Sequence, residues 1–185
     1  MVRIVGIGGS TSATSVTNRL LDSCLSRCAA RGALTDAILA DELAGLPIFG
    51  EASAQDSTAA RLVELVRAAD CVVIGTPGYH GGMSGLVKNA LDHLEFLRDD
   101  KRPYLDGRAV GVIVAAAGWQ ACGTTLMSVR STIHSLRGWP TPFGVTVNSA
   151  EELDEPESGF SPRIDGALDI LVGQLLDFAA HRLGS

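Results

Sequence analysis

The sequence contains no cluster of lysine and arginine residues and no apolar run of the roughly 18 residues that a membrane-spanning helix requires. Its net charge is −6 over 185 residues, and its pI is near 5.1. Basic patches attract nucleic acids and anionic membranes, so we expect neither as a partner. No signal peptide precedes the first apolar segment. We therefore expect a cytoplasmic protein.

The cysteines, at positions 24, 28, 71 and 122, do not form two close pairs. A zinc site generally needs a second close pair, so the spacing predicts no metal site. Cys24 and Cys28 are one helical turn apart in an apolar segment, which is typical of the buried face of a helix. We expect these thiols to be reduced, in agreement with a cytoplasmic location.

Charged residues are few, at 19% of the chain against 46% hydrophobic, where about a quarter is usual. This composition suits a sheet buried on both faces, or a chain that buries surface in an oligomer. The length fits one domain, which we place over residues 1–185.

Apolar runs alternate with segments of helical spacing along the chain, which indicates a parallel sheet with helices on both faces. The runs predict strands over residues 2–7, 34–39, 71–75, 109–116 and 141–147. The spacing predicts helices over residues 14–31, 57–69, 84–97, 124–137 and 163–181, with Asp56 or Ser57 capping the second. Residues 40–57 are expected to form an irregular connection, and residues 148–162 an acidic, mobile surface loop.

The turn after the first strand is rich in glycine and hydroxyl groups. Gly8 and Gly9 allow a sharp turn, and the helix that follows presents unpaired N–H groups and a partial positive charge. Hydroxyl groups that can donate to phosphate oxygens are supplied by Ser10, Ser12, Ser15 and Thr17. An ordinary strand-to-helix turn needs one such residue as a cap, so this turn predicts an anion site.

Three types of phosphate loop follow a first strand. A P-loop requires a Gly-Lys pair, which the sequence lacks. A dinucleotide fingerprint G-x-G-x-x-G would begin at Gly6, but its third glycine falls on Thr11. The hydroxyl-rich loop of flavodoxin-like proteins, which binds the terminal phosphate of FMN, fits best. We therefore expect a flavodoxin-like α/β three-layer sandwich, with a five-stranded parallel sheet in the order 2-1-3-4-5 and its ligand outside the carboxyl ends of strands one and three.

A second motif carries a specific resemblance. Residues 76–92, TPGYHGGMSGLVKNALD, closely resemble the T-P-x-Y-x-x-x-x-x-G-x-L-K-N-x-x-D signature of the NADPH-dependent FMN reductase family, and residues 46–49, LPIF, resemble its L-P-x-[FY] element. The resemblance implies a flavodoxin-like fold, FMN and NADPH or NADH as cofactors, and a homodimer or homotetramer. It also implies hydride transfer from nicotinamide to FMN, which needs no protein nucleophile, so no catalytic residue is expected.

The resemblance also assigns site residues. Ser10 and Ser15 match the family's G-S-x-R-x-x-S loop and Thr17 adds a further phosphate contact, but Ser12 replaces the arginine. Loss of that charge-assisted contact costs on the order of 1–3 kcal/mol of binding, so FMN binds loosely or another cation substitutes. The expected cofactor-binding residues are Ser10, Ser12, Ser15, Val16, Thr17, Thr76, Pro77, Gly78, Tyr79, His80, Gly81, Ala117, Gly118 and Trp119.

Several of these roles have alternatives. His80 either contacts the ligand or is a surface-loop histidine, and Trp119 either flanks the ring or packs at the base of its loop. Packing and capping roles are expected for Lys88, Asn89 and Asp92, and core or interface roles for Tyr104 and Trp139. The 2′-phosphate of NADPH has four candidate ligands: Lys101, Arg102, Arg108 and Arg130.

Four functions remain open on the sequence. The first is an FMN reductase that supplies reduced flavin, with a flavin-dependent monooxygenase as the partner that the resemblance implies. The missing arginine favours it because loose binding allows release. The second is a bound-FMN quinone, azo or chromate reductase with a ping-pong cycle, favoured because residues 124–131 lack an inserted tyrosine found in some flavin-releasing relatives. A flavodoxin-like electron carrier, or a Rossmann-type module using Asp41, fits less well. Residues 46–49 and the helix from Leu86 to Leu97 are the expected oligomer surfaces.

Overall fold

The computed structural model describes residues 1–12, 14–152 and 159–183. In the parallel sheet, β1 (Arg3–Gly8) lies between β2 (Leu34–Ile38) and β3 (Cys71–Pro77), and β4 (Ala109–Ala116) pairs with the other side of β3. Two short strands, β5 (Trp139–Pro140) and β6 (Val145–Asn148), pair in turn with β4. The predicted flavodoxin-like order 2-1-3-4-5 is confirmed, with the fifth strand in two pieces.

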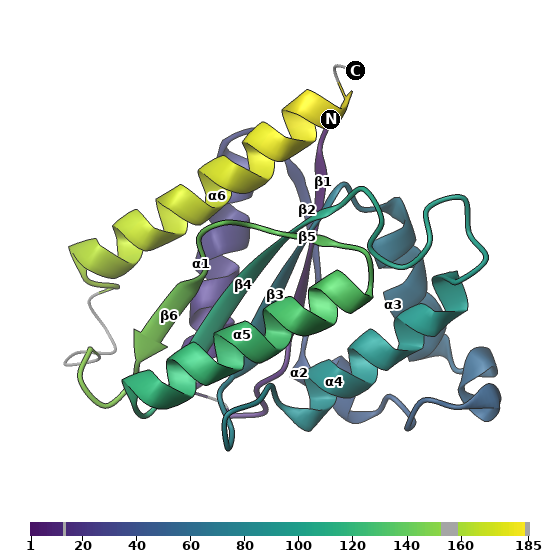
Figure 1. The fold of residues 1–185 in the computed structure, drawn as a ribbon, viewed down its shortest axis with the longest axis horizontal. Coiled ribbons are helices and arrows are strands. Elements are labelled where there is room, and N and C mark those ends of the chain that lie inside the picture. Colours follow the sequence, from purple (N-terminus) through teal and green to yellow (C-terminus); the bar gives the residue numbers. More distant parts are fainter. Residues whose placement is uncertain (13, 153–158, 184–185) are drawn as a thin grey trace.

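Helices cover both faces of this sheet (Figure 1). On one face α1 (Val16–Ala30) and α6 (Pro162–Leu183) cross each other, and on the other lie α3 (Ser57–Ala68), α4 (Gly85–Asp92) and α5 (Trp119–Ser135). Shorter elements complete the chain: α2 (Ala40–Ala44) and the 3₁₀ helices η1 (Glu51–Gln55) and η2 (His93–Leu97). None of the described helices is long and apolar enough to cross a membrane.

The core forms two layers because alternate side chains of each central strand point to opposite faces. Ile74 and Val112 pack toward α3, α4 and α5, whereas Val73 and Ile113 pack toward α1 and α6. Every residue of β3 and β4 is buried, which is why both strands read as continuous apolar runs. The four cysteines are free and buried, and Cys24 and Cys28 lie on the core face of α1 as predicted.

Four features differ most from the sequence expectation, apart from shifts of one or two residues at other element ends. The connection 40–57 holds α2 and η1, because Asp41 and Glu42 favour the start of a short helix. The fourth long helix begins at Trp119, not at residue 124, because Gly118 ends the preceding turn at φ 144°. The third helix becomes 3₁₀ after Asp92.

The fourth difference is the break in the last strand. Pro140 and Pro142 lack the N–H that a strand ladder requires. Between them, the amide of Thr141 donates to the carbonyl oxygen of Val110 on β4. Trp139 is 61% exposed and so does not belong to the core. The mobile loop expected over residues 148–162 falls in large part on residues 153–158, outside the described residues.

Candidate functional site

The first part of the site is the turn between β1 and α1. The amide of Gly9 donates to the carbonyl oxygen of Gly75 on β3 at 3.0 Å. A Cβ atom on Gly9 would lie 2.2 Å from Cγ2 of Val87 and 2.5 Å from Oγ of Ser84. The backbone therefore passes directly over the start of α4, and only glycine fits there.

Ser15 caps α1, and its hydroxyl oxygen accepts from the amide of Asn18 at 3.1 Å. The side-chain amide of Asn18 donates to the carbonyl oxygen of Ser10 at 3.0 Å, which fixes the turn against the helix. Ser12 is exposed, and its hydroxyl lies 3.4 Å from that of Thr14. Asn18 was not among the predicted site residues, although its Oδ1 is buried without a hydrogen-bonding partner among the described residues.

Several hydrogen-bond donors at this end of α1 have no partner among the residues that the structure describes. Ser10 and Thr17 are both buried, yet neither hydroxyl has a partner in the described part of the chain. The amides of Val16 and Thr17, in the first turn of the helix, likewise donate to no described residue. Unused donors at a helix N-terminus are the features that a phosphate group requires. This arrangement fits the terminal phosphate of FMN.

The second part of the site follows β3. Thr76 and Pro77 are the last residues of that strand, and Thr76 is completely buried. Its hydroxyl donates to the carbonyl oxygen of Pro77 at 3.0 Å and accepts from the amide of Ser84 at 2.9 Å. The ends of the loop from Gly78 to residue 83 are thus held together. Ser84 then caps α4 by accepting from the amide of Val87 at 3.3 Å.

Within this loop, residues 79–82 form a tight hairpin. The amides of Tyr79 and Gly82 each donate to the other's carbonyl oxygen at 2.9 Å. The two central residues, His80 and Gly81, both have positive φ, 51° and 83°, as a type I′ turn requires. This conformation is strained for histidine and is a feature of functional sites. Thr125 on α5 donates to the carbonyl oxygen of Gly82 at 3.3 Å and so anchors the hairpin.

The third part is the turn after β4. Ala117 is exposed, and the space where Gly118 would carry a Cβ is open. Trp119, the first residue of α5, donates from its indole nitrogen to Oε2 of Glu151 at 2.8 Å. The guanidinium of Arg163 lies 5.7 Å from the centre of its ring. Of the two roles expected for Trp119, these contacts favour packing beside the loop.

Two pockets lie on either side of the hairpin. One, of about 530 Å³, joins the second and third parts of the site; it is lined by His80, Gly81, Ala117, Gly118, Gln120, Ala121 and Thr124. The other, of about 480 Å³, adjoins the turn between β1 and α1, which we call the phosphate turn. It is lined by Gly9, Thr11, Leu43, Ala44, Leu46, Ile48, Tyr79, Ser84, Gly85, Leu86 and Asn89. None of these described lining residues is Lys, Arg, Asp or Glu.

Asn89 holds the far wall of the second pocket. Its Oδ1 accepts from the amide of Phe49 at 2.9 Å, and its Nδ2 donates to the carbonyl oxygen of Pro47 at 2.9 Å. Lys88 and Asp92 form an ion pair at 2.6 Å on the exposed side of α4. The packing role predicted for Asn89 is confirmed, whereas the predicted cap is provided by Ser84.

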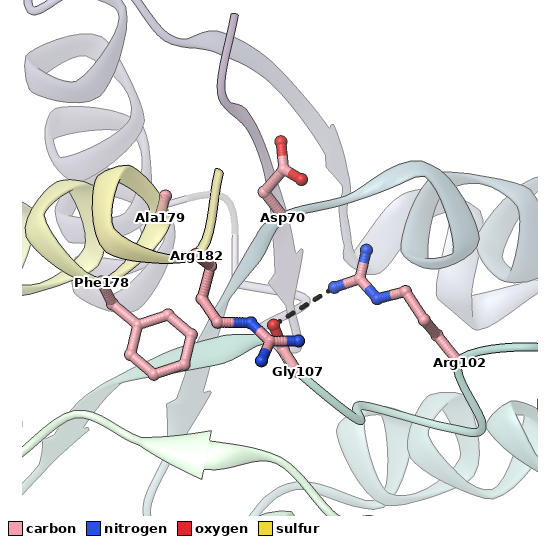
Figure 2. Close-up of a pocket in the computed structure, with 6 residues that line it drawn as sticks. All are labelled: Asp70, Arg102, Gly107, Phe178, Ala179 and Arg182. Carbon is pink, nitrogen blue, oxygen red and sulfur yellow. Dashed lines mark hydrogen bonds between the residues drawn. The ribbon is translucent and has the colours of Figure 1, made fainter. Parts of the chain in front are cut away.

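The arginines expected near a 2′-phosphate are used elsewhere. Arg102 donates to the carbonyl oxygen of Gly107 at 3.2 Å beside a pocket of about 170 Å³ (Figure 2). Arg108 is buried, and this burial lowers its pKa to about 10. Both contact the chain next to the amino ends of β3 and β4, whereas the site lies at the carboxyl ends of these strands. Arg130 donates to the carbonyl oxygen of Pro142 at 2.7 Å. Arg102 and Arg108 are therefore excluded as ligands at this site.

A parallel sheet of this order, with three glycine-containing turns at the carboxyl ends of β1, β3 and β4, defines a flavodoxin-like protein. The family model for NADPH-dependent FMN reductase matches residues 2–152. The chain belongs to this family, and the resemblance found in the sequence is confirmed.

Individual relatives agree with this membership. The chain is 35% identical over 94 residues to the FMN-dependent NADPH-azoreductase of Staphylococcus haemolyticus (strain JCSC1435), an alignment of 50% of this chain and 46% of that protein. The chain thus spans about half the length of the curated relatives it matches.

Solved structures share the fold. An oxidoreductase from Corynebacterium diphtheriae superimposes with a TM-score of 0.77 at 18% identity, covering 98% of both chains. FerB from Paracoccus denitrificans, described as a flavoenzyme NAD(P)H:(acceptor) oxidoreductase, superimposes with a TM-score of 0.75 at 18% identity, covering 96% of this chain and 99% of FerB.

Proposed function

We propose that the chain is an NAD(P)H-dependent FMN reductase whose flavin occupies the carboxyl edge of β1, β3 and β4. The observation that carries the proposal is a set of donors at the start of α1 without a partner among the described residues: the Ser10 and Thr17 hydroxyls and the Val16 and Thr17 amides. They lie at the point where the strand order reverses, which is where open α/β sheets bind their ligands.

The remaining predicted residues complete this site. Ser12 and Ser15 belong to the phosphate turn, residues 76–81 border the ribityl chain and ring, and residues 117–119 border the pyrimidine end. When bound, FMN accepts a hydride from reduced nicotinamide and passes the electrons on. The protein holds the ring, excludes water and offers backbone N–H groups to the pyrimidine edge. The neutral residues that line the two pockets are compatible with this reaction.

A second candidate keeps FMN bound and reduces a quinone, azo compound or metal oxyanion in a ping-pong cycle. The name of the Staphylococcus relatives, FMN-dependent NADPH-azoreductase, favours it. Serine in place of arginine at position 12 favours the first candidate, because a weaker phosphate contact allows reduced flavin to leave.

The test is the visible spectrum of protein purified without added flavin, followed by NADPH oxidation with and without FMN. A colourless protein whose NADPH oxidation requires added FMN supports the flavin-supplying reductase. A yellow protein that reduces a quinone or an azo dye without added FMN supports the bound-cofactor enzyme. A bound semiquinone without NADPH oxidation indicates an electron carrier and overturns the proposal, as does the absence of both colour and FMN-dependent oxidation.

We also propose that this single domain works in the cytoplasm as a homodimer or homotetramer, with a flavin-dependent monooxygenase as a possible recipient of reduced flavin. Ile48, which is 84% exposed at the rim of the 480 Å³ pocket, supports a buried interface there. Light scattering of the purified protein and of an Ile48→Glu variant tests the assembly, since the charge at an apolar interface shifts the mass toward the monomer.

A further inference from the structure

Arg19 differs from Arg27, further along α1, and from Arg31, the C-terminal cap of that helix. Arg27 forms ion pairs with Asp165 and Asp169, and Arg31 pairs with Asp169. The guanidinium of Arg19 has no hydrogen bond and no ion pair with any described residue, and it lies 5.1 Å from the centre of the Phe160 ring.

Arg19 lies one helical turn beyond Ser15, the residue that caps α1. Its amide donates to the carbonyl oxygen of Ser15 at 3.1 Å, so the two residues are four apart on the same face of the first helical turn. Helical side chains tilt toward the N-terminus of their helix, and the arginine side chain is long enough to span the turn of about 5.4 Å that separates it from Ser15. Its guanidinium can therefore reach an anion bound by the Val16 and Thr17 amides.

We propose that Arg19 is the cationic ligand of the flavin's terminal phosphate in this chain, a role that rests on the proposed function. The donors already at the turn, the Ser10 and Thr17 hydroxyls and the helix amides, are all neutral. On binding, the guanidinium leaves the Phe160 ring for the phosphate, because a charge-assisted hydrogen bond is stronger than a cation–π contact at an exposed site. Asp22, one turn further along α1, forms no ion pair with Arg19 among the described residues and does not hold it back.

The experiment compares binding of FMN and riboflavin, which differ only in the phosphate, by quenching of flavin fluorescence. In Arg19→Gln we expect FMN affinity to fall roughly tenfold while riboflavin affinity stays unchanged, the loss of one charge-assisted contact. Arg19→Lys should recover part of the affinity for FMN. Arg3→Gln removes the same charge at the opposite end of β1 and should change neither affinity.

Phe160→Ala gives an independent arm, because it frees Arg19 without touching the turn. FMN affinity should be equal to or higher than that of the wild type. The ³¹P resonance of bound FMN should move in Arg19→Gln and stay in place in Arg3→Gln.

Equal loss of FMN and riboflavin binding in Arg19→Gln would overturn the proposal, since it would indicate a general effect on the fold. Unchanged FMN binding in Arg19→Gln would overturn it as well. If the wild-type protein binds neither flavin, the proposed function fails together with the role of Arg19. If the wild type binds FMN and Arg19→Gln binds it equally well, only the role of Arg19 is rejected.

Discussion

The amide of Ser84 donates to the hydroxyl oxygen of Thr76 at 2.9 Å, and this single bond joins the end of β3 to the start of α4. The same hydroxyl donates to the carbonyl oxygen of Pro77. Thr76 was expected to contact the flavin through a loop that approaches the ring. Its side chain shapes that loop from within, since the residue is completely buried and its hydroxyl bonds to Pro77 and Ser84.

Replacing Thr76 by valine keeps the shape and removes the hydroxyl. The Ser84 amide is then buried without a partner, which costs about 1–3 kcal/mol of unfolding free energy and loosens the hairpin, so flavin affinity falls as well. Urea unfolding and fluorescence titration measure the two effects. Thr76→Ser retains the hydroxyl and should keep flavin affinity near that of the wild type; equal losses in both variants would show that the hydroxyl is not responsible.

Two glycines of the site offer a matched comparison. In Gly9→Ala the new Cβ meets the Val87 side chain at 2.2 Å, and the overpacking should cost about 1–3 kcal/mol and displace the phosphate turn. Gly85→Ala has no atom within 4 Å of its Cβ and lies at the start of α4, so it should be neutral or stabilise by about 0.5–1 kcal/mol.

Thermal and urea unfolding of both variants test this contrast. Val87→Ala in the Gly9→Ala background should restore part of the loss, because it removes the methyl group that clashes. A double-mutant cycle without coupling between positions 9 and 87 would contradict the close approach seen here.

Asn89 connects α4 to residues 46–49. Asn89→Ala removes hydrogen bonds to Phe49 and Pro47, and we expect a loss of about 1–3 kcal/mol together with faster proteolysis between α2 and η1. Lys88→Ala, which breaks an exposed ion pair on the neighbouring position, should cost less than about 0.5 kcal/mol. Similar effects of the two substitutions would argue against the bridging role.

The buried thiol of Cys71 should make the protein less stable at alkaline pH. Burial raises the pKa of its thiol from 9.0 to about 12. The unfolded chain therefore releases this proton at a lower pH than the folded chain does. Ionisation of Cys71 thus lowers the free energy of unfolding as pH rises above 9. At pH 10 the titration of Cys71 should lower the free energy of unfolding by about 1 kcal/mol relative to pH 8.

The measurement is urea unfolding at the two pH values for the wild type and Cys71→Ala. The variant should lose about that much less between pH 8 and pH 10. An identical pH dependence in the two proteins would show that the thiol titrates equally in the folded and unfolded states.

The central strands were predictable because a strand buried on both faces reads as a continuous run of apolar residues. β4 begins and ends at the residues expected from the sequence, and Asp56 caps α3 by accepting from the amides of Thr58 and Ala59. The start of α5 was not predictable from local preference, because residues 118–123 begin and end with glycine and so resemble a loop. The helix begins there since Gly118 takes a conformation open mainly to glycine and Cys122 packs into the core.

The loops of the site could be located from composition, but their internal bonds could not. Trp119 contacts Glu151 and Arg163, which are distant in the sequence and come near it only through the topology. The hydroxyls of Ser15 and Thr76 look alike in sequence to those of Ser10 and Thr17. Only the fold separates the hydroxyls of Ser15 and Thr76, which bond within the chain, from those of Ser10 and Thr17, which have no partner among the described residues.

The break in the last strand has a consequence for contacts between molecules. An exposed sheet edge with a continuous row of backbone groups can recruit a strand from another chain. At this edge β5 has two residues and β6 has four, with Pro140 and Pro142 at the interruption. Because proline provides no N–H to a neighbouring strand, this side of the sheet resists intermolecular strand addition, and copies of the chain that meet here must associate through side chains.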